Sequence, residues 1–183
     1  MKDRLTEKAA EFSEINSIAV KGGIVVFGST YMAEFPLYEL LGKCRLEHAV
    51  YNRSIEGLTL DEAAELIDVC AVELAPHKLF LALGDHDYSD PNAADKYKKL
   101  IETLRLRLPD TQIYVTEIPK ADAAHFNAEM KKLCRTLGIT YIDLDTSAAT
   151  QRGRYIARFK RLSSRFHDTP LSMADAFAIS GLM

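Results

Sequence analysis

Residues 24–32 read Ile-Val-Val-Phe-Gly-Ser-Thr-Tyr-Met, and this stretch decides the fold. A short β-branched run ends at Gly28, and two hydroxyl residues, Ser29 and Thr30, precede a helical pattern. Where a strand turns sharply into a helix, the side chain at the turn is exposed and the first N–H groups of the helix point towards it. This geometry favours a nucleophile and the oxyanion that it creates, although a plain helix N-cap uses the same residue types.

The composition is that of a folded globular protein. With 183 residues, of which 48% are hydrophobic and 27% charged, the chain predicts a single domain, residues 1–183. A formal net charge of −3 gives no electrostatic argument for nucleic acid or an anionic membrane, so we expect neither as a partner. Residues 1–8 are too charged for a signal peptide, and no apolar run reaches membrane-spanning length. These features, with three widely spaced cysteines, predict a cytoplasmic protein with reduced thiols.

Strand-like and helix-like segments alternate along the chain. Short apolar runs predict strands at residues 24–27, 46–51, 79–83, 113–116 and 139–144. Helical spacing and end signals predict helices at residues 5–15 (within a leading segment, 1–20, packed on the domain), 32–41, 59–75, 91–108 and 122–137, and from about Ser172. This order is typical of βαβ units, so we expect a parallel sheet of about five strands with helices on both faces.

Polar residues follow several of the predicted strands. They lie at residues 28–30, 52–54 and 84–87, and in the segment before Ser172. In parallel sheets of this kind, ligands bind at the carboxyl ends of the strands. The sequence therefore predicts one site, at that edge of the sheet, to which these segments contribute.

Four stretches carry a resemblance to the SGNH (GDSL-type) hydrolase family. Residues 22–42, GGIVVFGSTYMAEFPLYELLG, resemble the family's GGIVFLGDSITEFFPVEELLG without a gap. Residues 51–60, YNRSIEGLTL, resemble YNRGIGGDTT, and residues 80–88, FLALGDHDY, resemble FLLIGTNDL; residues 137–149, LGITYIDLDTSAA, look like the family's last strand. The resemblance covers about residues 12–179. It implies a flavodoxin-like α/β/α fold and hydrolysis of carboxylic esters.

The family's nucleophile and oxyanion donors are replaced in this chain. The family uses a Ser nucleophile, and Thr30 stands at its position, with Ser29 in place of the preceding Asp. Thr30 keeps a hydroxyl but adds a methyl group that crowds the attack; Ser29 is the alternative nucleophile if the turn is shifted by one residue. Ser54 replaces a Gly whose N–H binds the oxyanion, and it retains a backbone N–H. His86 replaces an Asn, and its ring N–H can imitate the amide donor.

The family's general base is replaced as well. Residues 166–179 stand where the family carries an Asp-x-x-His pair, with Pro170 at the base position and His167 at the Asp position. Proline has no group that accepts the proton, and without a base the hydroxyl is a poor nucleophile. His167 is the candidate substitute base, with Asp168 as its orienter, if the loop folds differently from the family's.

Other polar residues of the matching blocks complete the candidate site. Asn52, Gly84 and Asp87 are candidates for binding the oxyanion or the substrate. Residues 85–87, Asp-His-Asp, suggest a metal site, but such loops more often form a capped turn, so we expect neither a metal nor another cofactor. The basic run at residues 152–165 is interpreted as a solvated helix face, with contact to an anionic ligand as the alternative.

Two functions of different classes follow. The first is hydrolysis of an ester, such as an acyl or acetyl group on a carbohydrate or lipid, weakened because the signature residues are replaced. The second is a catalytically inactive family member that keeps the pocket as a binding or interaction module, with a small-molecule ester or carbohydrate as ligand. A metal-assisted hydrolase using Asp85, Asp87 and His167 is a third possibility. The sequence does not indicate the oligomeric state.

Overall fold

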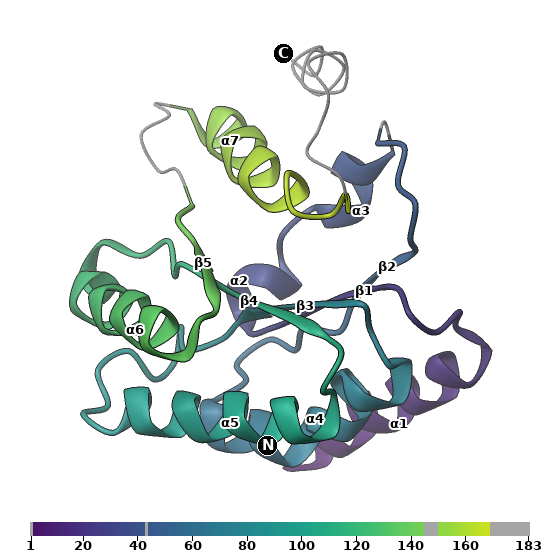
Figure 1. Ribbon diagram of the computed structural model, residues 1–183, viewed down its shortest axis with the longest axis horizontal. Coiled ribbons are helices and arrows are strands. Elements are labelled where there is room, and N and C mark those ends of the chain that lie inside the picture. The colour runs from purple at the N-terminus through teal and green to yellow at the C-terminus, as the bar shows by residue number, and fades with distance from the viewer. Residues whose placement is uncertain (1, 43, 145–149, 169–183) are drawn as a thin grey trace.

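The computed structural model describes residues 2–42, 44–144 and 150–168, and its centre is a five-stranded sheet (Figure 1). All neighbouring strands are parallel, in the order β2-β1-β3-β4-β5. The strands are β1 (Ile24–Gly28), β2 (Val50–Asn52), β3 (Lys78–Ala82), β4 (Gln112–Thr116) and β5 (Thr140–Ile142). This is the flavodoxin-like order, which confirms the expected three-layer α/β/α architecture.

Four longer helices cover one face of the sheet (Figure 1). They are α1 (Lys2–Ile18), α4 (Leu60–Cys70), α5 (Ala93–Arg107) and α6 (Ala124–Leu137). Alternate strand residues, such as Val25 and Phe27 of β1, join them in one hydrophobic core. Two single turns of 3₁₀ helix, η1 (Val72–Leu74) and η2 (Ala121–Ala123), precede β3 and α6.

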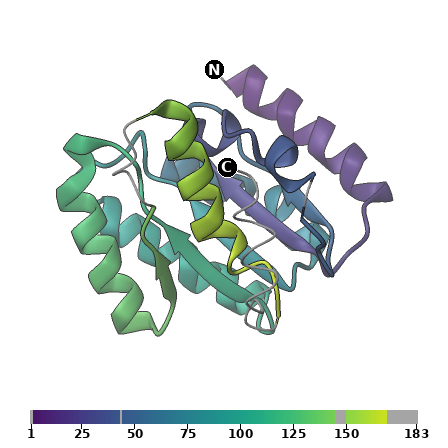
Figure 2. The same ribbon diagram turned by 90° about the horizontal axis from the view of Figure 1, so that it is seen from above.

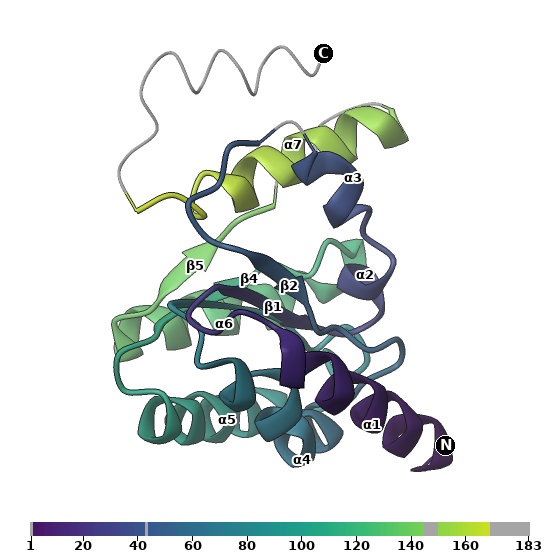
Figure 3. The ribbon, with the colours of Figure 1, turned by 90° about the vertical axis from the view of Figure 1, so that its right-hand side faces the viewer.

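The other face carries α2 (Thr30–Ala33), α3 (Leu37–Leu41) and α7 (Gln151–Ser163), as Figure 3 shows from the side. Ile24 and Val26 of β1 point into this second core, together with Phe80 of β3. Every residue of β1 and of β3 is buried, because central strands of a parallel sheet are covered on both faces. The continuous apolar runs in the sequence reflect this position.

Local end signals act as expected in two helices. The Thr59 hydroxyl accepts the N–H of Glu62 while the Glu62 carboxylate accepts the N–H of Thr59, so a capping box is present at the start of α4. Gly138 ends α6 in the left-handed region, at a φ of 64°. Both signals are local, which is why the sequence shows them directly.

Some predicted boundaries are wrong. The helix expected at residues 32–41 is two short helices, α2 and α3, because Pro36 lacks an N–H and disfavours a helical residue before it. The strand expected at residues 46–51 is shorter and later, at β2. The helix expected from Ser172, like Pro170, lies outside the described residues. None of the helices in the described segments is long and apolar enough to span a membrane.

Candidate active site

The turn from β1 to α2 positions the first candidate residues. A Cβ atom at Gly28 would lie 2.8 Å from the Cβ of Met32 and 2.9 Å from the carbonyl oxygen of Ala82, so a glycine is needed for this close packing. Ser29 is the N-cap of α2, and its N–H donates to the Ala82 carbonyl at 3.0 Å. The Ser29 side chain is completely buried, at 0% exposure. A buried hydroxyl is out of reach of a substrate, which favours Thr30 over Ser29 as the nucleophile.

Thr30 and His86 form a close polar pair at the carboxyl edge of the sheet. The Thr30 Oγ1 atom lies 2.7 Å from the His86 Nε2 atom. The N–H of Gly57 donates to the same Oγ1 at 2.8 Å. Because this N–H occupies one lone pair, the hydroxyl proton can be donated to Nε2 when the ring proton is on Nδ1. Thr30 is half-buried and His86 exposed, so the pair has the geometry of a solvent-accessible nucleophile and general base.

Asp85 and Asp87, on either side of His86, both accept hydrogen bonds from helix N-termini. The Asp85 Oδ2 atom accepts the N–H of Tyr31 in α2 at 3.0 Å, and the Asp87 Oδ2 atom accepts the N–H of Leu60 in α4 at 3.1 Å. A carboxylate is favoured at a helix N-terminus by the helix dipole. The two carboxylates of this loop therefore cap α2 and α4, and burial raises the pKa of Asp87.

Gly84 makes this capped loop possible. It has a φ of 106°, and a Cβ atom there would lie 2.6 Å from the ring of Phe126. Its role is to let the loop adopt this conformation beneath α6, which is structural and needs no contact with a substrate.

Asn52 and Ser54 hold the loop after β2 against α2. The Asn52 Nδ2 atom donates to the Met32 carbonyl at 3.0 Å, and the Asn52 Oδ1 atom accepts the N–H of Ser54 at 3.1 Å. The Ser54 N–H, expected as an oxyanion donor, is therefore already occupied by a side chain. The Ser54 Oγ atom is buried and has no hydrogen-bond partner within the part of the chain that the structure describes.

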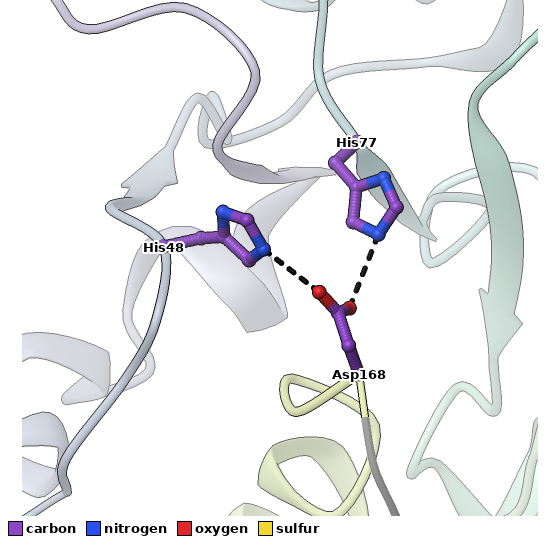
Figure 4. Close-up of side chains that lie close together, drawn as sticks. All are labelled: His48, His77 and Asp168. Atoms are coloured by element: carbon purple, nitrogen blue, oxygen red, sulfur yellow. Dashed lines mark hydrogen bonds and ion pairs between the residues drawn. The ribbon is translucent and has the colours of Figure 1, made fainter.

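Asp168 lies at the opposite, amino edge of the sheet. Its carboxylate contacts the Nε2 atoms of His48 and His77 at 2.9 and 3.1 Å (Figure 4), and the Nζ atom of Lys78 at 2.8 Å. His48 precedes β2, and Lys78 is the first residue of β3. The Lys78 ammonium and these imidazoles hold the pKa of Asp168 well below its usual range.

His167 is held at the same edge. Its carbonyl oxygen accepts a hydrogen bond from Lys78 Nζ at 2.7 Å. β3 continues from Lys78 for four more residues, about 13 Å, before the edge where Thr30 lies. The structure does not bring His167 or Asp168 to Thr30, and this placement argues against their expected roles as base and orienter.

The His48, His77 and Asp168 cluster contains ligand types that bind metal ions. The three ligand atoms lie within 4.8 Å of one another. However, the Lys78 side chain is only 3% exposed, and its ammonium contacts the same carboxylate. Since a buried ammonium needs a counter-charge, we interpret this cluster as an ion-pair network that anchors the segment after α7.

A pocket of about 710 Å³ opens between the loop after β4, the start of α6 and one face of α7. Its charged lining residues are Glu117, Lys120, Arg154 and Arg158. The Lys120 Nζ atom donates to the Asp85 carbonyl at 2.8 Å, so one wall of the pocket contacts the loop that carries His86. Glu117 and Lys120 carry no sequence signal for this pocket, whereas Arg154 and Arg158 belong to the basic run at residues 152–165.

Comparison with known proteins agrees with this architecture. No family model and no curated protein matches the sequence. Among solved structures, a Streptococcus pneumoniae protein whose description names a platelet activating factor has a TM-score of 0.68 and 19% identity, over 96% of this chain and 89% of its own. A GDSL-like lipase from Bacteroides thetaiotaomicron has a TM-score of 0.61 and 10% identity, over 95% and 93%. A family two carbohydrate esterase from Clostridium thermocellum, in complex with cellohexaose, has a TM-score of 0.56 and 11% identity, over 80% and 64%. At these identities the likeness establishes the fold.

Proposed function

We propose that this chain, which has the SGNH/GDSL-type hydrolase fold, is a slow ester hydrolase in which Thr30 is the nucleophile and His86 the general base. The 2.7 Å contact between Thr30 Oγ1 and His86 Nε2 carries the proposal. It lies at the carboxyl edge of the sheet, where such folds bind their ligands. In this proposal His86 acts as the general base, a role that Pro170, at the family's base position, cannot perform.

The proposed reaction has two steps. His86 Nε2 takes the proton of the Thr30 hydroxyl as Oγ1 attacks the ester carbonyl, and the alcohol then leaves with that proton. A water molecule, deprotonated by His86, attacks the resulting acyl-threonine, and the acid leaves as the proton returns to Thr30. The N–H of Thr30 is available to the oxyanion, since the first N–H groups of a helix have no intrahelical acceptor.

Several features support a low rate. The methyl group of Thr30 crowds the attack, and the Ser54 N–H already donates to Asn52. Loss of one oxyanion donor typically costs about 100- to 1,000-fold in turnover. The Asp85 carboxylate, bound to the N–H of Tyr31, adds a negative charge beside the position of the oxyanion. We therefore expect a turnover far below the usual enzyme median of about 10 per second.

The same Asp85 contact favours a second candidate function, a binding module that has lost catalysis. In either case the ligand is a small-molecule ester or a carbohydrate; the cellohexaose complex of the structurally similar esterase supports the carbohydrate.

We also propose that the protein is cytoplasmic. The free thiols of Cys44, Cys70 and Cys134 support this location.

Hydrolysis of p-nitrophenyl acetate by the purified full chain tests the proposal. Slow turnover should be lost in Thr30→Ala and in His86→Ala. Mass spectrometry after rapid acid quenching should find an acetyl group on the peptide containing Thr30. His125→Ala is the matched control, because His125 is a surface residue of α6 whose side chain is 87% exposed.

Two results would overturn the proposed activity. One is turnover that Thr30→Ala leaves unchanged. The other is an absence of turnover above the uncatalysed rate in buffer; saturable binding of a cello-oligosaccharide would then favour the binding module.

A further inference from the structure

The pocket between the loop after β4 and α7 gathers positive charge on a chain that is acidic overall. Three cationic side chains, Lys120, Arg154 and Arg158, line it, against one carboxylate, Glu117. The whole chain has a formal net charge of −3. A concave surface with an excess of one sign concentrates ligands of the opposite sign.

Within the described segments, Arg158 interacts with the charge of Glu117 and Lys120 with that of Asp122, but neither cation is in a direct ion pair. Among the ion pairs of residues 2–42, 44–144 and 150–168, none involves Lys120, Arg154 or Arg158. Lys120 donates to a neutral carbonyl, and the Arg158 guanidinium lies 5.3 Å from the centre of the Tyr31 ring. The Arg158 Nε atom is buried and makes no hydrogen bond of ordinary geometry within these same segments, although the guanidinium lies close enough to the Tyr31 hydroxyl to oppose the rise in its pKa. A buried donor without a partner favours a ligand that supplies the acceptor.

The one carboxylate of the pocket is already engaged. The Glu117 Oε2 atom accepts the N–H of Leu144 at 2.7 Å, and burial raises the pKa of Glu117. Its negative charge is therefore partly compensated by the backbone, which leaves the pocket with a net positive charge.

The start of α6 adds a further favourable group. Ala121 and Ala124 line the pocket, and α6 runs for 14 residues from Ala124 with no acidic residue in its first turn. Its N-cap, Ala123, makes no side-chain hydrogen bond to the first turn, and the 3₁₀ turn η2, which contains Asp122, directly precedes it. Figure 2 shows the first turn of α6 on the same side of the molecule as the first turn of α7. The positive end of the helix dipole therefore favours an anion here.

Both walls of the pocket contact residues adjacent to the Thr30–His86 pair. Lys120 bonds to Asp85, the residue before His86, and Arg158 lies over Tyr31, the residue after Thr30. We infer that this pocket binds an anionic group, a carboxylate or a phosphate, of the ester on which the pair acts. Guanidinium groups bind both anions through paired hydrogen bonds. This identification of the substrate class rests on the proposed function, whereas anion binding itself does not.

Calorimetric titration of the full chain at low ionic strength tests anion binding without any need for catalysis. The probes are inorganic phosphate, succinate and the neutral dimethyl ester of succinic acid. We expect saturable binding of phosphate or of succinate, and no binding of the neutral ester. The anion that binds more tightly indicates whether the anionic group of the substrate is a phosphate or a carboxylate.

Variants then locate the site. Arg158→Gln should weaken binding of the anion at least about tenfold, the effect of losing one charge-assisted hydrogen bond. Lys120 lies outside α7, so Lys120→Gln should weaken binding of the anion independently of Arg158. Arg158→Lys keeps the positive charge and should retain part of the affinity. Arg161→Gln is the matched control, since Arg161 is an exposed residue of the same helix. Circular dichroism of each variant verifies folding.

Kinetics connect the pocket to the reaction. Arg158→Gln should raise the KM for the mono-p-nitrophenyl ester of succinic acid more than the KM for p-nitrophenyl acetate, whereas Arg161→Gln should change neither. Equal anion binding by Arg158→Gln and Arg161→Gln, or no saturable binding by the wild-type chain, would overturn the inference. If anions bind here but Thr30→Ala hydrolyses esters normally, the proposed function fails while the anion site stands. If hydrolysis requires Thr30 but no anion binds, only the pocket inference fails.

Discussion

In the proposed mechanism, His86 serves as the general base from a position where the family has an oxyanion donor. At the position of an amide donor, its imidazole lies 2.7 Å from the Thr30 hydroxyl and can accept a proton as well as donate one. An Asn amide nitrogen has no such acceptor. The same edge of the sheet can therefore supply a base although proline occupies the family's base position.

The first prediction separates the two candidate bases. His86→Ala should lower ester hydrolysis about 100- to 10,000-fold, the usual contribution of a general base. His167→Ala should leave the rate unchanged, because the segment that carries it is held by Lys78 at the opposite edge of the sheet. Steady-state rates with p-nitrophenyl acetate provide the measurement. A large loss in His167→Ala, with His86→Ala unaffected, would reverse the assignment.

The second prediction concerns Asp85. Asp85→Asn removes a negative charge beside the start of α2 while the amide oxygen can still accept the N–H of Tyr31. We expect hydrolysis to rise by about tenfold, because a like charge near a developing oxyanion raises the barrier. The turnover rate at neutral pH is the readout. Asp110→Asn, in an exposed turn, serves as the control. An unchanged or lower rate would show that the Asp85 charge does not limit the reaction.

At the scale of elements, long-range contacts between loops and helix ends organise the site. The loop after β3 supplies a carboxylate to α2 through Asp85 and one to α4 through Asp87. At the other edge, Asp168 joins the segment after α7 to the starts of β2 and β3. These contacts join elements that are far apart in the sequence, so no local sequence pattern predicts them.

The third prediction concerns the pH dependence of stability through Asp87. Burial raises the pKa of this carboxyl above its unfolded value of about 3.9, so ionisation costs the folded state more than the unfolded state. The folded state is therefore favoured below the unfolded pKa, and this advantage is lost as the pH rises through the folded pKa. The Asp87→Asn variant lacks this dependence. Its Tm relative to wild type should rise from about pH 4 upwards and then level off.

Thermal unfolding of both chains between pH 3 and pH 8 measures this difference. The Asn side chain can still accept the N–H of Leu60, so the cap of α4 is retained. Asp110→Asn again provides a control, with no expected change in slope. A relative Tm that falls as the pH rises would show that the Asp87 carboxylate stabilises the fold.

At the scale of the whole molecule, two hydrophobic cores share one sheet. Phe80 links β3 to its neighbours in the second core: its ring stacks on Tyr114 at 4.6 Å between centroids and meets Phe166 edge-on at 5.1 Å. Because the strands between the two cores are common to both, we propose that residues 1–183 unfold as one domain.

The fourth prediction tests this cooperativity. Phe80→Ala should lower the free energy of unfolding by about 3–5 kcal/mol, the usual cost of removing a buried phenyl ring. Urea unfolding followed by circular dichroism and by tyrosine fluorescence should give one coincident transition in both chains. Leu106→Ala, at a residue that is 84% exposed, is the control and should change little. Separate transitions for the two probes would contradict a single cooperative domain.

The sequence predicted those features that depend on neighbouring residues. Buried central strands appear as continuous apolar runs, and the cap at Thr59 and the stop at Gly138 are local patterns. The single helix expected at residues 32–41 is instead two helices, because a proline near the start of a helical pattern can either begin a helix or separate two. The resemblance of four stretches then indicated the family's fold and placed Thr30, Ser54 and His86 at one edge of the sheet.

By itself, therefore, the sequence determined the alternation of strands and helices, the parallel sheet and the edge at which the polar residues gather. The tertiary structure decided which of those residues meet. It paired Thr30 with His86 across 56 residues, anchored Asp168 at the far edge, and turned Arg154 and Arg158 towards a pocket beside the pair. The physical reason is that periodicity and capping act over a few residues, whereas side-chain pairing depends on how strands and loops distant in sequence pack together.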